Sequence, residues 1–317
     1  MSEWAVQVHE LTKRFGRFTA VNRVTFAVRR GEIFGFLGPN GAGKSTTIRM
    51  LCGIIEPTSG TGTVLGLDIR TQTEQIRERI GYMSQRFSLY EDLTVAENIE
   101  FYAGVYGVTN ERLRARKRWV LAMAGLEGRE NTLTAELSVG WKQRLALGCA
   151  IVHEPEILFL DEPTSGVDPL SRRQFWDLIY HMAKGGVTVF VTTHYMDEAE
   201  HCERLCLIYR GRIVALGTPE EMKTRYSAGA LVEVEVEPQM PALERLIADP
   251  QVYDAAVFGR RLHVVLPTEI DASAYLQRAL HEAGFRVTSL EVVSPSLEDV
   301  FVALVEQTDR ELGEVSA

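Results

Sequence analysis

The sequence predicts an α/β fold built on a parallel sheet, followed by a small α+β domain. Three observations predict it. A glycine-rich loop, Gly38–Ser45, stands between an apolar run and a helical pattern. A second apolar run, Glu156–Glu162, ends in two carboxylates, which suits a buried parallel strand whose charges lie at its exposed carboxyl end. After residue 227 the chain alternates between strand and helix patterns without another such loop.

Length and composition indicate a soluble globular protein with two domains, expected at 1–227 and 228–317. The chain has 317 residues, of which 45% are hydrophobic and 24% charged. No run approaches the roughly 18 apolar residues of a membrane span. The first residues, Met1–Trp4, carry no secretory signal, so a cytoplasmic location is expected. The formal net charge of −9 argues against a general nucleic-acid binder.

The cysteines suit reduced, buried thiols. None of Cys52, Cys149, Cys202 and Cys206 forms a C-x-x-C pair. A metal site at Cys202 and Cys206 with His201 is disfavoured because the spacing matches no usual zinc framework.

The N-terminal part predicts an antiparallel strand pair over Val6–Val28, then a buried strand over Ile33–Leu37 and a helix over Ser45–Leu51. Phe15, which stands beside a turn, either stacks on a purine base or belongs to the core.

The loop between that strand and helix has the spacing G-x-x-x-x-G-K-[ST], which predicts a P-loop NTPase core. Its glycines let successive N–H groups and the positive end of the next helix converge on nucleotide phosphates. Lys44 would reach the β- and γ-phosphates, and Ser45 would bind Mg²⁺. The residues expected to bind the nucleotide here are Gly38, Pro39, Asn40, Gly41, Ala42, Gly43, Lys44, Ser45 and Thr46.

The middle of the chain predicts a helical insertion over about 89–152. A short strand, Ile80–Gln85, precedes it and ends in a polar residue, at the place where ligands of α/β sheets collect. The elements expected around it are a loop and strand in Thr58–Gly66 and helices at Thr73–Arg79, Asp92–Gly107 and Glu111–Ala124. The basic cluster Arg112–Arg118 favours a solvated helix face over a nucleic-acid or lipid contact.

Two predicted strands that end in polar residues follow the helical insertion. Asp161 would hold Mg²⁺, and Glu162 would orient and deprotonate the attacking water. After a helix over Ser171–Lys184, the strand Val187–Thr193 ends at His194, a candidate γ-phosphate contact.

The chain resembles the ATP-binding subunits of bacterial ABC transporters over residues 4 to about 227. The motifs stand in the family's order: Phe15 at the base-stacking aromatic, Gly38–Thr46 as Walker A, Gln85 as the Q-loop glutamine, Leu137–Trp141 at the signature loop, Ile157–Asp161 as Walker B, Glu162 as the catalytic glutamate, Ser165–Asp168 as the D-loop and His194 as the switch histidine. The signature departs from the family pattern L-S-G-G-Q at Val139 and Trp141.

The resemblance implies an ATPase that uses ATP and Mg²⁺, with Ser45, Gln85 and Asp161 at the metal. It also implies a two-fold dimer, in which Ser138 and Gly140 of one subunit meet the nucleotide on the other. Ser138 is expected to cap a helix whose N–H groups face an anion.

The resemblance further implies a subunit that drives separate, multi-span permease subunits from the cytoplasmic side of the membrane. The segment Arg86–Tyr90 stands where the family receives a permease helix, and core packing is the alternative for it. The run Pro295–Phe301 is similar to the ending of ATPases that serve drug and glycoconjugate exporters. The alternative function is a soluble ABC-type ATPase that acts on ribosomes or nucleic acid; a GTP switch is disfavoured because no N-K-x-D motif stands at the expected place.

For residues 228–317 the patterns predict a β-α-β-β-α-β order, that is, a small ferredoxin-like sandwich with an accessory or regulatory role. The expected elements are Leu231–Val236, Pro241–Ala248, two strands in Val252–Leu266 about a turn at Gly259, Ala272–Ala283, Arg286–Val293 and a closing helix, Leu297–Val305.

Overall fold

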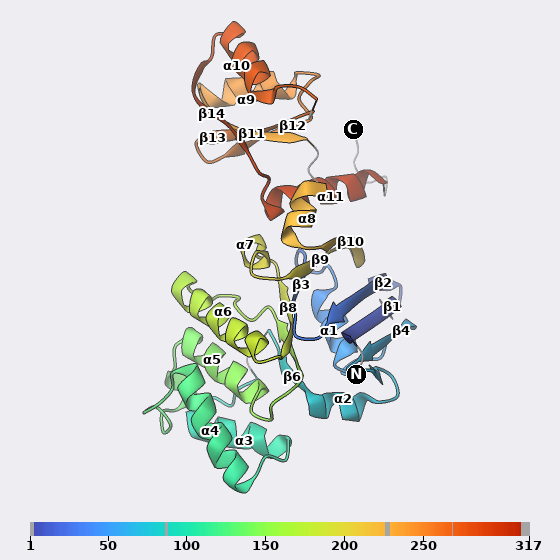
Figure 1. Ribbon diagram of the computed structural model, residues 1–317, viewed down its shortest axis with the longest axis vertical. Coiled ribbons are helices and arrows are strands. Elements are labelled where there is room, and N and C mark those ends of the chain that lie inside the picture. The colour runs from blue at the N-terminus through green and yellow to red at the C-terminus, as the bar shows by residue number, and fades with distance from the viewer. Residues whose placement is uncertain (1–2, 86–87, 226–228, 268, 312–317) are drawn as a thin grey trace. The chain divides into compact units, whose positions relative to one another are not determined.

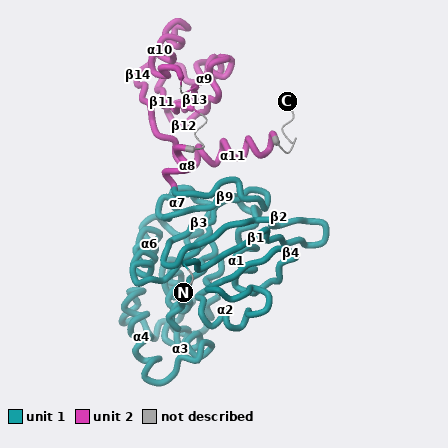
Figure 2. Tube along the Cα trace, turned by 45° about the vertical axis from the view of Figure 1, so that its right-hand side comes forward, with its two compact units in different colours: residues 1–218 teal, residues 219–317 magenta. Residues whose placement is uncertain are grey.

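The structure is a computed structural model that describes residues 3–85, 88–225, 229–267 and 269–311. The chain divides into two compact units, residues 1–218 and 219–317 (Figure 2). The sequence prediction placed the boundary after residue 227, whereas the observed division falls just before helix α8 (Pro219–Arg225), which that prediction did not include.

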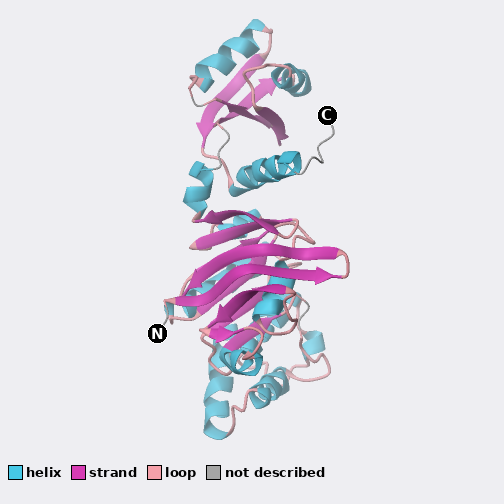
Figure 3. Ribbon diagram, turned by 90° about the vertical axis from the view of Figure 1, so that its right-hand side faces the viewer, coloured by secondary structure: helices cyan, strands magenta, loops and turns pink. Residues whose placement is uncertain are grey.

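A six-stranded sheet forms the centre of the first unit, in the order β10-β9-β3-β8-β7-β6. Strands are drawn in magenta in Figure 3. Strands β3, β6, β7, β8 and β9 run parallel, and only β10 is antiparallel to its neighbour. The parallel arrangement is therefore confirmed. The strands are β3 (Ile33–Leu37), β6 (Ile80–Met83), β7 (Ile157–Asp161), β8 (Thr188–Thr193), β9 (Arg204–Tyr209) and β10 (Arg212–Gly217). The sequence interpretation did not include β9 and β10.

A second, antiparallel sheet has the order β2-β1-β4-β5. Its strands are β1 (Trp4–Phe15), β2 (Phe18–Arg29), β4 (Ser59–Val64) and β5 (Leu67–Asp68). The predicted strand pair over Val6–Val28 is confirmed.

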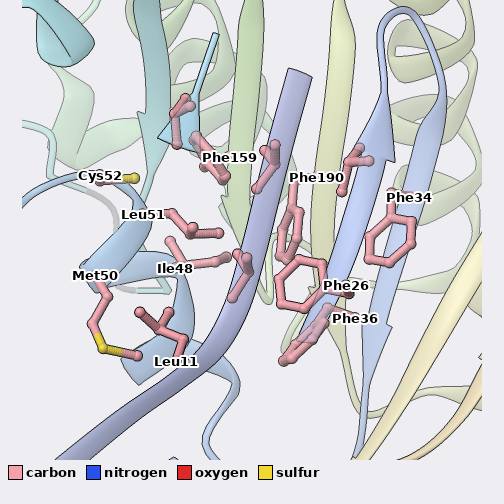
Figure 4. Packing of buried hydrophobic residues seen from close by; sticks show 14 of the residues in the cluster. Leu11, Phe26, Phe34, Phe36, Ile48, Met50, Leu51, Cys52, Phe159 and Phe190 are labelled. Atoms are coloured by element: carbon pink, nitrogen blue, oxygen red, sulfur yellow. The ribbon is translucent and has the colours of Figure 1, made fainter. Parts of the chain in front are cut away.

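The alternation of side chains along β7 explains why its sequence is apolar throughout. Ile157 and Phe159 point into a core shared with the antiparallel sheet and with helix α1 (Lys44–Leu51), where Phe159 lies 5.5 Å from the ring centroid of Phe190 (Figure 4). Leu158 and Leu160 belong to the core on the opposite face. Both faces of the strand are thus buried, as expected of a central parallel strand.

Helices cover that opposite face and form a separate subdomain (Figure 1). Helix α6 (Pro169–Lys184) and helix α5 (Val139–Ala150) pack on the sheet, and α5 also packs on α3 (Val95–Val105) and α4 (Asn110–Ala124). Short helices occur at α2 (Thr73–Arg79), the 3₁₀ turn η1 (Thr134–Glu136) and α7 (Met196–Ala199).

Three residues of the basic cluster on α4 form ion pairs within the first unit, whereas Arg114 and Arg118 are exposed. Arg112 and Arg116 both pair with Glu154, at 3.0 and 3.2 Å, and Lys117 pairs with Glu100 at 2.5 Å. The cluster therefore contributes to the cohesion of the subdomain through local ion pairs. All four cysteines are buried free thiols, as predicted.

The second unit contains the predicted β-α-β-β-α-β order. Its antiparallel sheet has the order β12-β13-β11-β14, and alternate residues of β11, such as Val232 and Val234, pack against Leu243 and Leu276 of the two helices. The elements are β11 (Ala230–Glu237), α9 (Gln239–Ile247), β12 (Asp254–Phe258), β13 (Arg261–Leu266), α10 (Ala272–Glu282) and β14 (Arg286–Val293). The closing helix α11 (Leu297–Glu311) is longer than predicted.

Candidate nucleotide site

Four neighbouring strands bring the predicted site residues to one edge of the central sheet. The order β3-β8-β7-β6 is parallel, so the carboxyl ends of these strands lie side by side. The glycine-rich loop follows β3, His194 follows β8, Glu162 follows β7, and Gln85 stands two residues after β6. This edge is where ligands of parallel sheets bind.

The glycine-rich loop wraps closely because two of its glycines stand where the surrounding backbone leaves no room for a side chain. A Cβ added to Gly38 would lie 2.2 Å from the carbonyl oxygen of Ile208. Gly43 has a φ of 111° and would place a Cβ 2.6 Å from the carbonyl oxygen of Ala20. Helix α1 begins directly afterwards at Lys44, so its free N–H groups open into the loop.

Lys44 is held at the centre of the loop. Its Nζ donates to the carbonyl oxygens of Gly38 at 2.7 Å and Pro39 at 3.1 Å, and it lies 2.9 Å from Glu162 Oε1. The Lys44 and Glu162 side chains are only 4% and 7% exposed. The cation and the carboxylate therefore form a buried ion pair.

The Glu162 side chain contacts residues that follow three other strands of the sheet. Besides Lys44, its carboxylate accepts a hydrogen bond from Gln85 Nε2 at 3.0 Å and lies 3.3 Å from His194 Nδ1. Its backbone N–H donates to the carbonyl oxygen and Oγ1 of Thr192, at 3.1 and 3.0 Å. Its φ is +48°, an unfavourable value for a residue with a side chain, which the surrounding contacts must maintain.

Asp161 offers oxygen ligands suited to Mg²⁺. Its Oδ1 accepts hydrogen bonds from Ser45 Oγ and Thr192 Oγ1, both at 2.9 Å. Its Oδ2 is buried and has no hydrogen-bond partner among the described residues. Burial, with a smaller contribution from the Glu162 charge, raises the pKa of the Asp161 carboxyl. A hard cation beside Oδ2 and Ser45 Oγ would satisfy the orphaned oxygen and favour the ionised form, so the residues present fit the ion.

The signature residues stand apart from this edge, at the start of α5. Ser138 is at the N-cap position, as predicted, but its side chain accepts no capping hydrogen bond. Ser138 and Val139 are exposed, and a Cβ added to Gly140 would lie 2.7 Å from Ser171 Oγ. The ring of Trp141 lies 5.1 and 5.0 Å from the guanidinium carbons of Arg129 and Arg144, within the range of cation–π contacts.

The other predicted site residues are placed as follows. Phe15, at the end of β1, is 51% exposed, and Lys13 Nζ lies 5.1 Å from its ring centroid. Asn40 and Gly41 are exposed at the loop tip, whereas Thr46 is half-buried in α1.

Sequence reasoning missed Thr192, which holds both Asp161 and Glu162. A signal was available, because Thr192 and Thr193 are the polar residues that end an otherwise apolar run.

Family models match most of the chain. The model described as "ABC transporter" covers residues 21–165, and that described as "ATP-binding protein DrrA1-3-like, C-terminal domain" covers residues 217–305. The chain is 36% identical over 311 residues to the Nod factor export ATP-binding protein I of Ralstonia nicotianae, a match that spans 97% of this chain and 94% of the relative. The chain belongs to the ABC transporter family, as an ATP-binding subunit.

Two further members of the family match about two thirds of the chain. The probable multidrug ABC transporter ATP-binding protein YbhF of Escherichia coli is 54% identical over 226 residues, which span 70% of this chain but only 39% of that protein. A solved structure described as the dimeric, post-hydrolysis state of the ATP-binding cassette MJ0796 bound to ADP and Pi has a TM-score of 0.62 and 28% identity. That match covers 67% of this chain and 98% of the other.

Proposed function

We propose that this chain binds and hydrolyses ATP to power a separate membrane permease, in an exporter. The observation that carries the proposal is the convergence of Lys44, Asp161, Glu162 and His194 at the carboxyl edge of one parallel sheet. A phosphate cradle alone would serve binding. Hydrolysis also needs a general base, and the Glu162 carboxylate is held beside the cradle by Lys44 and Gln85, with the His194 imidazole 3.3 Å away.

In the binding step, the loop N–H groups and Lys44 Nζ would hold the β- and γ-phosphates. Lys44 would then exchange its contact with Glu162 for phosphate oxygens. Ser45, Asp161 and Gln85 would hold Mg²⁺, which when bound neutralises charge on the phosphates and links them to the protein. Phe15 would stack on the purine base.

In the hydrolytic step, the Glu162 carboxylate would accept a proton from a water that attacks the γ-phosphorus, while the bond to the β-phosphate oxygen breaks. His194, 3.3 Å from Glu162, would donate a hydrogen bond to the γ-phosphate and keep the carboxylate oriented.

The site would be completed by a second copy of the chain. Ser138 and Gly140 lie at an exposed helix N-terminus, where free N–H groups attract an anion. In a two-fold dimer this N-terminus would meet the nucleotide on the partner. The MJ0796 cassette, described as dimeric with ADP and Pi, supports this arrangement.

The permease contact is proposed near the end of β6. Tyr90 is 45% exposed and packs edge-on against Phe101 at 4.7 Å, and Val105, one turn further along α3, is 63% exposed. These side chains form an exposed apolar patch beside the segment predicted to receive a permease helix; Arg86 and Phe87 lie outside the described residues. No helix in the described part of the chain is long and apolar enough to cross a membrane. We propose that the permease contact places the chain at the inner face of the membrane.

Export is supported by the relatives' names, multidrug ABC transporter and Nod factor export, which do not favour the alternative of a ribosome- or nucleic-acid-acting ATPase. Two measurements test the function. The purified chain should hydrolyse ATP, and Glu162→Gln should lower turnover by about 10²- to 10⁴-fold while ATP binding persists. Fractionation of host cells should recover the chain with membranes; recovery with ribosomes, or a parental rate for Glu162→Gln, would contradict the proposal.

A further inference from the structure

Two buried polar side chains outside the nucleotide site hold the peptide that follows Glu162. Gln143, on α5, is fully buried, and its Nε2 donates to the carbonyl oxygen of Pro163. Glu198, on α7, is 1% exposed and accepts a hydrogen bond from Thr164 Oγ1. The two residues after Glu162 are thus fixed from two different elements.

Both groups are costly to bury, and neither is fully satisfied. Gln143 Oε1 and Glu198 Oε2 have no hydrogen-bond partner among the described residues. Glu198 Oε1 forms an ion pair with Arg172 on α6, 3.5 Å from its Nε, but the two groups make no hydrogen bond. Apolar residues of similar shape would avoid the desolvation costs, so stabilisation of the fold alone does not account for an amide and a carboxylate at these positions.

Their placement connects the strand ends. Thr164 stands two residues after Glu162, and Glu198 stands four residues after His194, so the Thr164–Glu198 hydrogen bond links the segment beyond β7 to the segment beyond β8. Glu162 itself has a left-handed backbone, which its own side chain disfavours. A restraint immediately downstream keeps that conformation and therefore the direction of the carboxylate.

We propose that Gln143 and Glu198 are positioning residues for ATP hydrolysis. They clamp the Pro163-Thr164 peptide and thereby keep the Glu162 carboxylate in position beside His194. The proposal rests on the proposed function and deepens it. Neither residue is among those assigned to the nucleotide. Gln143 lies on α5, whose N-cap is Ser138, so its hydrogen bond connects this helix to the carbonyl of Pro163.

Steady-state ATPase kinetics of matched variants test the clamp. Thr164→Val removes only the hydroxyl donor at nearly constant shape, and Gln143→Met removes the amide in a side chain of similar length. Each should lower kcat by about 10- to 100-fold, the usual consequence of a small misplacement of a reacting group, with KM and ATP affinity changed by less than about twofold. Thr164→Ser and Glu198→Gln keep the donor and the acceptor, so both should retain near-parental kcat.

Controls separate the possible outcomes. Asp197→Ala removes an exposed acid on the same short helix together with its 3.5 Å pair to Arg172, and should leave kcat unchanged because Asp197 does not contact the Pro163-Thr164 peptide. The clamp is refuted if Thr164→Val and Gln143→Met keep the parental kcat while Glu162→Gln is inactive. It is also refuted if KM and kcat worsen together in these variants. A Thr164→Ser variant as impaired as Thr164→Val would refute it as well. Parental activity in Glu162→Gln would overturn the proposed function as well. Circular dichroism of each variant identifies loss of folding, which would make the role structural and also refute the clamp.

Discussion

The buried ion pair between Lys44 and Glu162 predicts that the loss of one partner destabilises the nucleotide-free protein. Lys44→Met keeps the length and approximate volume of the side chain but removes the cation, which leaves the 7% exposed Glu162 without its charge partner. Removal of one member of a buried pair typically costs about 3–5 kcal/mol. For a unit of about 200 residues this corresponds to a fall in Tm of about 6–20 °C.

Thermal unfolding followed by circular dichroism measures the effect, with Glu162→Gln and the double variant as companions. Glu162→Gln keeps the shape and an acceptor oxygen, and in the double variant neither buried charge remains unpaired. The double variant should therefore be less destabilised than the sum of the two single changes, by at least about 1 kcal/mol. Additive effects, or a Tm for Lys44→Met within about 2 °C of the parental value, would refute the reasoning. Lys44→Met should also lose tight ATP binding, and unchanged affinity in a direct titration would contradict the role of Lys44 at the phosphates.

Three further predictions concern other parts of the chain. Ser138→Arg should leave ATP binding by the monomer intact but prevent ATP-driven dimers, and dimers of this variant in light scattering would rule out the arrangement in trans. Burial, reinforced by nearby arginines, lowers the pKa of His153 to about 4 in the folded chain. As the pH falls, the unfolded chain therefore binds a proton at this histidine before the folded chain does. The free energy of unfolding should decrease as pH drops from about 6.5 to 4. The parental chain should lose about 3 kcal/mol relative to His153→Gln over this range, and equal pH profiles in denaturant titrations would exclude the effect. Deletion of residues 219–317 should leave a folded, ATP-binding first unit, because every expected nucleotide contact precedes Thr218; a soluble, folded product that cannot bind ATP would refute this division.

The part of the site that could be predicted is the part in which sequence neighbours determine the geometry. The spacing of Gly38, Gly43 and Lys44 by itself specifies a tight loop at a helix start, and the structure contains it. The run that ends in Asp161 and Glu162 likewise specifies a buried strand with polar groups at one end. Parallel pairing then brings these ends together without further information.

The remaining features depend on contacts between distant segments. Strands β9 and β10 complete one edge of the central sheet. Whether a short apolar segment forms a strand there depends more on the strands beside it than on its own β propensity. The pairing of Thr164 with Glu198 joins residues 34 positions apart on different elements. No local pattern distinguishes Glu198 from the exposed acid Asp197 beside it, although one is 1% and the other 72% exposed.

The Lys44–Glu162 pair also bears on how binding and hydrolysis are linked. In the structure the group assigned to the phosphates and the group assigned to the attacking water contact each other at 2.9 Å. Phosphate oxygens that bind Lys44 Nζ would have to replace this contact with Glu162 Oε1. Glu162 would then keep the hydrogen bond from Gln85 and the neighbouring His194. The same exchange that fixes the γ-phosphate would therefore free a carboxylate oxygen for the attacking water, so that Glu162 becomes available as a base only once there is a nucleotide to hydrolyse.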